Sequence, residues 1–164
     1  MKIPKRYIPP QLSDKDRTRQ RKNIMKSRKL YKSRKYFVRP KVDSFISKPS
    51  NHVKTAKQMY SISNVRPSRK LSIKTGCSRK TLEGIVNKGR AAYYSGGSRP
   101  NQTPDSWGYA RLASAITGGN ASIVDYHLLH SGCKSTSKAL KLATKKCRDK
   151  QKCKKYTMKN KGKK

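Results

Sequence analysis

Positive charge is distributed very unevenly along this chain, and the distribution limits how much of it can fold alone. Of the 43 Lys and Arg residues, 6 lie between Gly76 and Gly132, and the other 37 lie in the two flanks. The central stretch has a net charge of +3, whereas the N-terminal flank carries +20 and the C-terminal flank +13. Like charges at this density repel one another, so the flanks are expected to become ordered only against an anionic partner.

The composition predicts one small domain with a limited core. Hydrophobic residues make up 32% of the 164 residues and charged residues 30%, with one sign dominant, which is close to the composition of disordered chains. We predict a mainly α fold with a small helical core, a long extended basic N-terminal arm and a Lys-rich C-terminal tail. The predicted divisions are a basic arm with one helix at 1–50, a helical core at 51–132, and a basic helix and tail at 133–164.

Capping residues and apolar spacing predict a series of helices. The strongest signal is Thr103 as N-cap, Pro104 at the first helical position and Asp105 in the first turn. After the possible N-cap Ser13, the segment 17–35 predicts a long basic helix that has few apolar residues and is expected to face solvent or a partner. The remaining predicted helices cover 53–60, 71–75, 78–93, 122–130 and 135–146.

The segment from Leu71 to Leu82 has the pattern of a helix-turn-helix. Gly76 suits a turn that needs a positive φ, and Arg79 and Lys80 would then begin a helix that enters the major groove of DNA. The same pattern also fits an ordinary corner between two helices, and Gly84 within the second helix favours that interpretation.

The basic flanks are candidates for phosphate contacts. Aromatic residues at Tyr31, Tyr36 and Phe37 lie among the charges, where unpaired bases could stack on them. The candidate nucleic-acid-binding residues are Arg28, Lys29, Arg34, Lys35, Arg79 and Lys80. The alternative is that the same side chains wrap around an acidic protein partner.

Nothing in the sequence indicates an enzyme or a cofactor. The chain has 7 carboxylates with no useful pairing, and no Ser–His–Asp or Cys–His arrangement can be inferred. His127, His130 and Cys133 lack the paired Cys-x-x-Cys spacing of a structural zinc site, so no metal site is predicted.

The four cysteines are expected to be free thiols, as is usual for a protein made in the cytosol. They are Cys77, Cys133, Cys147 and Cys153. No apolar run reaches the length of a membrane span, and the N-terminus has no signal-peptide segment.

The long central string from Asn87 to Ser114 resembles an uncharacterised domain family of large double-stranded DNA viruses of algae and protists. The resemblance extends through Pro4 to Pro9, Ser27 to Lys32 and Ala121 to His127, and it fades after Cys133. It carries no chemistry to any residue here. It implies a viral product, and a small basic virion component is a plausible member of such a family.

Together these observations predict a non-enzymatic minor capsid or cement protein of a large icosahedral DNA virus, made in the host cytoplasm. Its arm would bridge major capsid subunits and other minor capsid proteins, with Tyr7, Ile8, Tyr36 and Phe37 as apolar anchors. The alternative is a DNA-binding protein, either a genome condenser or a helix-turn-helix regulator.

Overall fold

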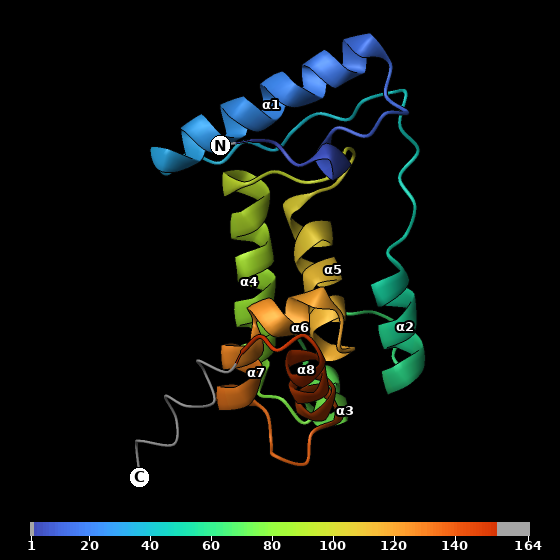
Figure 1. Ribbon diagram of the computed structural model, residues 1–164, viewed down its shortest axis with the longest axis vertical. Helices are drawn as coiled ribbons and strands as arrows, with labels where there is room; N and C mark the ends of the chain where they lie inside the picture. The colour runs from blue at the N-terminus through green and yellow to red at the C-terminus, as the bar shows by residue number, and fades with distance from the viewer. Residues whose placement is uncertain (1, 154–164) are drawn as a thin grey trace. The chain divides into compact units, whose positions relative to one another are not determined.

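The computed structural model describes residues 2–153, and within this range the chain is built from eight α-helices and one short 3-10 helix, without a strand. This confirms the predicted mainly α class. The elements are η1 (Lys5–Tyr7), α1 (Asp14–Lys32), α2 (Asn51–Tyr60), α3 (Arg69–Thr75), α4 (Arg79–Ser95), α5 (Pro104–Ile116), α6 (Asn120–Val124), α7 (Tyr126–Gly132) and α8 (Lys138–Asp149) (Figure 1).

Contacts within the chain group it into two compact units. Among the described residues, unit 1 contains 2–48 and 88–108, and unit 2 contains 49–87 and 109–153. These boundaries differ from the predicted divisions at 1–50, 51–132 and 133–164. The central segment 88–108 lies with the N-terminal basic segment, and α8 lies with the helices of the predicted core.

Unit 1 is organised around α1. The side chain of Ser13 caps this helix by accepting a hydrogen bond from the backbone N–H of Asp16 at 3.3 Å. The buried side chains of α1 are Asp16, Gln20, Ile24 and Ser27, which follow one helical face. Only one of the four is apolar, so this face is held mainly by hydrogen bonds.

Three of these polar side chains bond to other segments of unit 1. The carboxylate of Asp16 accepts hydrogen bonds from the backbone N–H and the hydroxyl of Ser44, at 2.9 and 2.6 Å. The amide of Gln20 donates to the carbonyls of Tyr7 and Ser98, at 3.2 and 3.3 Å. These bonds satisfy groups that would be costly to bury alone.

A glycine allows the 88–108 segment to approach α1 closely. Gly97 has φ +113°, and a Cβ at this position would lie 3.2 Å from Ile24 and 3.3 Å from Tyr7. The ring of Tyr7 also meets Trp107 edge-on, with ring centroids 5.8 Å apart. We expected the basic helix to face solvent or a partner. This expectation is wrong, because α1 packs against other segments of its own unit.

Unit 2 contains a continuous hydrophobic core. Leu82, Ile85, Leu112, Ile116 and Leu129 are all fully buried in it. The buried phenol of Tyr60 donates a 2.6 Å hydrogen bond to the carbonyl of Ile116, and burial raises the pKa of this phenol. Apolar burial of this kind stabilises a domain by roughly 25 cal/mol per Å² of apolar surface.

The predicted helix 122–130 is interrupted in the structure, where α6 ends at Val124 and α7 begins at Tyr126. The fully buried Asp125 between them accepts two bonds from the guanidinium of Arg111, at 2.7 and 2.8 Å. A carboxylate in such a site needs a cationic partner, so the break in the helix coincides with a buried ion pair.

All four cysteines are bonded in the structure, so the prediction of free thiols is wrong. Cys77 pairs with Cys133, and Cys147 pairs with Cys153. The turn after α3 and the end of α7 run antiparallel there, with Ser78 N–H donating to Gly132 O at 2.7 Å and Lys134 N–H donating to Gly76 O at 2.8 Å. This backbone pairing brings together two cysteines that are 56 residues apart.

Candidate nucleic-acid interface

The solvent-facing side of α1 carries a stripe of positive charge. Lys15, Arg19, Lys22, Lys26 and Lys29 are all exposed and follow one another at intervals of three or four residues. At a rise of about 1.5 Å per residue, the stripe is about 21 Å long. We call these five residues the α1 stripe.

Acidic groups do not neutralise the α1 stripe. The helix has two acids, both in its first turn: Asp14 bonds to Arg17 at 3.2 Å, and Asp16 is buried. The hydroxyl and the backbone N–H of Ser44 lower the pKa of Asp16, and Arg19 adds a smaller effect in the same direction. No stripe residue lies within salt-bridge distance of a carboxylate in residues 2–153, so the stripe is available to an external anion.

An aromatic cluster lies at the C-terminal end of α1. The rings of Tyr31 and Tyr94 are nearly parallel, with an interplanar angle of 8° and centroids 6.1 Å apart. Tyr36 meets both rings edge-on, at 6.0 Å from Tyr31 and 5.0 Å from Tyr94. The structure thus brings together two of the three aromatic residues that the sequence indicated, and it adds Tyr94, which sequence reasoning missed.

The third predicted aromatic residue, Phe37, contacts the α1 stripe. The ammonium group of Lys26 lies 4.5 Å from the centroid of its ring, within cation–π range. Phe37 is half-buried. The predicted combination of aromatic and cationic side chains is therefore present at this end of unit 1.

A buried arginine supports the aromatic cluster from within. Arg39 is 7% exposed, lies 3.6 Å from the centroid of the Tyr93 ring, and donates to the carbonyl of Tyr93 and the hydroxyls of Ser27 and Ser98. Burial lowers the pKa of its guanidinium. A lone Arg in a basic segment gives no sequence signal that distinguishes it from its exposed neighbours, and sequence reasoning missed it.

Two of the predicted partner anchors lie in less accessible positions than expected. Tyr7 is buried in unit 1 and Ile8 is half-buried, whereas Tyr36 is 68% exposed. Tyr7 is therefore an internal contact of unit 1, and we do not assign it to a partner.

Among the predicted nucleic-acid-binding residues of unit 1, one is engaged within the unit. The guanidinium of Arg28 donates to the carbonyl of Gly96 at 2.7 and 3.0 Å. Lys29, Arg34 and Lys35 are exposed. Lys29 is part of the α1 stripe, and Arg34 and Lys35 extend this basic surface next to the aromatic cluster.

The predicted helix-turn-helix segment forms two helices joined at Gly76, which has φ +71°. Arg79 and Lys80 begin α4 and are exposed, and Arg79 bonds to Glu83 at 2.8 Å. The turn is covalently tied through Cys77 to Cys133. Such an anchored turn is what a corner between packed helices requires, and DNA readout by these residues stays a prediction.

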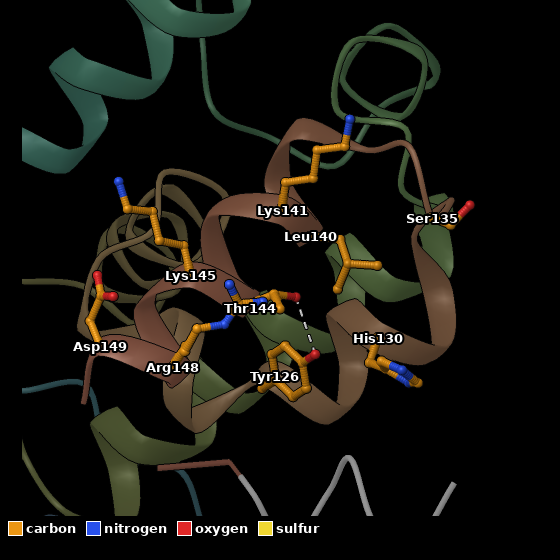
Figure 2. Close-up of a pocket in the computed structure, with 9 residues that line it drawn as sticks. All are labelled: Tyr126, His130, Ser135, Leu140, Lys141, Thr144, Lys145, Arg148 and Asp149. Atoms are coloured by element: carbon orange, nitrogen blue, oxygen red, sulfur yellow. Dashed lines mark hydrogen bonds between the residues drawn. The ribbon is translucent and has the colours of Figure 1, made fainter. Parts of the chain in front are cut away.

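Unit 2 has a second basic helical face on α8. Lys138, Lys141, Lys145 and Arg148 are exposed at helical spacing, while Ala139, Ala143 and Cys147 are buried. Figure 2 shows that the side chains of Lys141 and Lys145 extend away from Tyr126 and Thr144, whose hydroxyls lie 3.2 Å apart. Tyr126, Lys141, Thr144 and Lys145 line a shallow hollow of 590 Å³, and Asp149 also lines it.

Residues 2–153 contain no group of three or more His, Cys, Asp or Glu side chains that could hold a metal ion. The predicted run with His127 and His130 ends at Cys133, whose sulfur is bonded to Cys77. In the same range, no helix combines the length and the apolar character needed to cross a membrane.

Comparison with known proteins places the chain in a family. Residues 4–128 match the model of a family of unknown function, DUF5824. The chain belongs to this family. The match includes unit 1 from residue 4 onward, with the α1 stripe and the aromatic cluster, and it ends within α7, before α8. No curated protein and no solved structure matches the chain.

Proposed function

We propose that this protein binds nucleic acid without enzymatic activity and that the α1 stripe contacts the phosphate backbone. The observation that carries the proposal is the division of α1 into two faces. One face is buried and bonded within unit 1, and the other presents five cations, none of which lies within salt-bridge distance of a carboxylate in residues 2–153. A fixed cationic face of this kind suits a polyanion better than a single small ligand.

The dimensions of the α1 stripe fit this role. Double-stranded DNA carries about one negative charge per 1.7 Å of its axis, so a stripe about 21 Å long spans about 12 phosphates. Lysine predominates in the stripe, with one arginine among five residues. Lysine contacts phosphate as a point charge, and contacts to phosphate carry no sequence information directly. We therefore expect binding that depends strongly on salt and weakly on sequence.

A charge-matched comparison tests the proposal. Lys22→Gln, Lys26→Gln and Lys29→Gln together remove three charges from the α1 stripe, and Lys138→Gln, Lys141→Gln and Lys145→Gln remove three from α8. Fluorescence anisotropy with a labelled DNA duplex should show a larger loss of affinity for the α1 variant. No binding by the wild-type protein at low salt, or equal losses for both variants, would overturn the assignment to α1.

A second candidate is the minor capsid or cement role suggested by the viral resemblance. The observation that favours it is a segment of unit 1 that exposes three large apolar side chains. Tyr36 is 68% exposed, Val38 56% and Ile46 85%. Side chains of this kind are typical anchors in protein interfaces. In this role the segment would contact the major capsid protein or other minor capsid proteins in the virion.

Mass spectrometry of purified particles distinguishes the two candidates. A cement protein should remain with DNA-free shells in a fixed ratio to the major capsid protein. A nucleic-acid-binding protein should leave with the released genome, or be absent from particles and present on nucleic acid in infected cells.

A further inference from the structure

We infer that Tyr36, held against Tyr31 and Tyr94, is a stacking platform for unpaired bases, so that the ligand of this surface is single-stranded nucleic acid. The inference rests on the proposed function and specifies its ligand. The α1 stripe accounts for phosphate contact, which single and double strands share. The aromatic cluster adds a feature that only an exposed base face can use.

The cluster offers one ring to solvent and supports it with two others. Tyr36 is 68% exposed, while Tyr31 and Tyr94 are half-buried and their rings are inclined to that of Tyr36 by 65° and 63°. Tyr93 lies behind Tyr94, edge-on at 5.2 Å, and is fully buried. An exposed tyrosine backed by packed rings is a rigid flat surface, and aromatic rings of this kind stack nucleic-acid bases of any sequence.

The backbone on either side of Tyr36 is fixed. At the end of α1, Arg34 N–H donates to Tyr31 O and Lys35 N–H donates to Leu30 O, at 3.0 and 2.9 Å. This pair of bonds is a Schellman motif, and it places Arg34 at φ +56°. Beyond Tyr36, the N–H of Arg39 donates to the phenol oxygen of Tyr93 at 3.0 Å. The ring therefore does not have to be ordered by its ligand, which lowers the entropic cost of binding.

A charged residue occupies position 34, where glycine would be conformationally favoured. Glycine adopts a positive φ without a steric penalty and is the usual residue at this place in the motif. Here Arg34 occupies it and is exposed, two residues before the platform. With Lys32 and Lys35, which are also exposed, it surrounds the turn with three cations. Phosphates on either side of a stacked base would meet positive charge.

An acid that influences the cluster is engaged in an ion pair. Burial raises the pKa of Tyr94, and Tyr93 and the carboxylate of Asp105 add smaller effects in the same direction. This carboxylate accepts a 2.6 Å bond from Arg90. The surroundings of the platform are therefore cationic, which favours a strand with a charged backbone over a neutral apolar peptide.

Duplex DNA cannot use this platform without unstacking, because its bases already stack on one another. The surface should therefore prefer a single strand with bases to the same backbone without them. A strand of abasic residues carries the same charge and flexibility and lacks only the rings.

The test compares an oligothymidine with an abasic strand of equal length, using the full-length protein. Wild-type protein should bind the oligothymidine at least about fivefold more tightly, which is the lower end of the effect of one stacked base. Tyr36→Ala should abolish this difference and leave the affinity for the abasic strand unchanged. Tyr36→Phe should retain the difference, and unchanged Trp107 fluorescence would show that unit 1 remains folded.

The outcomes separate this inference from the proposed function. Equal affinity for the two strands, with strong salt dependence, would overturn the platform and leave phosphate binding by α1 intact. Equal losses for Tyr36→Ala on both strands would also overturn it, since the residue would then support the surface without stacking. Failure of the wild-type protein to bind either strand at low salt would overturn the proposed function itself.

Discussion

The two units have a comparable net charge but very different interiors. In the described residues, unit 1 has a net charge of +16 and unit 2 of +14. Eighteen buried side chains form the hydrophobic cluster of unit 2, and two disulfides lie within it. Unit 1 buries five hydrophobic side chains: Tyr7, Leu12, Ile24, Val42 and Tyr93. It relies also on hydrogen bonds that Asp16 accepts and that Gln20 and Arg39 donate.

This contrast shows two ways to carry excess charge. In unit 2, an apolar core and covalent links hold the helices together against repulsion. In unit 1, polar bonds hold a charged helix whose outer face is unneutralised, so its stability should depend more on salt and on bound anions. Trp107 lies in unit 1 and is the only Trp of the chain, so its fluorescence reports this unit.

The largest expected effect is on the buried ion pair of unit 2. Arg111→Ala would leave the buried Asp125 carboxylate without its guanidinium, and we expect a loss of about 3–5 kcal/mol in the free energy of unfolding. Urea unfolding followed by circular dichroism measures it. Arg79→Ala is the control, because the Arg79–Glu83 pair is exposed and should change stability by less than about 1 kcal/mol. Similar losses for both variants would contradict the buried character of the pair.

The next effect concerns the covalent link in unit 2. Cys77→Ser with Cys133→Ser should lower the stability of unit 2 by roughly 2–4 kcal/mol, because the bond closes a loop between residues 56 apart. The Cys147–Cys153 bond spans 6 residues, so the double Ser variant there should cost less. Urea unfolding under non-reducing conditions compares them, and a larger cost for the shorter loop would contradict this order.

A smaller effect is expected at the close approach in unit 1. Gly97→Ala should destabilise unit 1 by about 1–3 kcal/mol, because a Cβ would crowd Ile24 and Tyr7 and the φ of +113° is unfavourable for alanine. Trp107 fluorescence during urea unfolding is the measurement.

Gly84→Ala in unit 2 provides a control of opposite sign. Gly84 lies within α4, and a Cβ there would make an ordinary contact of 3.9 Å with Leu128. The higher helix propensity of alanine should therefore stabilise unit 2 by up to about 1 kcal/mol. An unchanged unfolding midpoint for Gly97→Ala would show that α1 does not pack as described.

The smallest effect is a pH dependence of the stability of unit 1. Because the pKa of Asp16 is lowered in the folded state, its contribution is present above the unfolded pKa of about 3.9 and is lost as the pH falls through the folded value. The Trp107 unfolding midpoint should therefore fall between neutral pH and about pH 3. Asp16→Asn should reduce this dependence. An equal fall in Asp16→Asn would assign the dependence to other carboxylates.

Local signals in the sequence predicted most of the helices. The predicted cap Ser13 accepts the N–H of Asp16 at the start of α1, and the predicted cap Thr103 accepts the N–H of Ser106 at 3.0 Å ahead of α5. The helix predicted at 135–146 begins later, at Lys138, with Ser137 as its cap. The basic helix α1 begins at Asp14, directly after the predicted N-cap Ser13, and ends at Lys32, three residues before the predicted end at 35. Caps and apolar spacing act over a few residues, so they can be recognised without knowledge of the tertiary structure.

The features that sequence reasoning missed depend on residues far apart in the chain. The buried face of α1 contains Asp16, Gln20 and Ser27, so a search for apolar spacing could not detect it. The bond between Cys77 and Cys133 follows from backbone pairing across 56 residues. At the candidate interface, the sequence indicated Lys29, Arg34, Lys35 and Tyr36. It did not single out the other four residues of the α1 stripe, and the supporting roles of Tyr94 and Arg39 depend on tertiary packing.

The salt dependence of DNA-duplex binding tests the central claim most directly. Affinity should fall linearly with salt on logarithmic axes, and the variant with Lys22→Gln, Lys26→Gln and Lys29→Gln should show a slope shallower by about 2.7, which corresponds to three lost phosphate contacts. An unchanged slope in this variant would contradict the account, because the α1 stripe would then not be the surface that meets the phosphates.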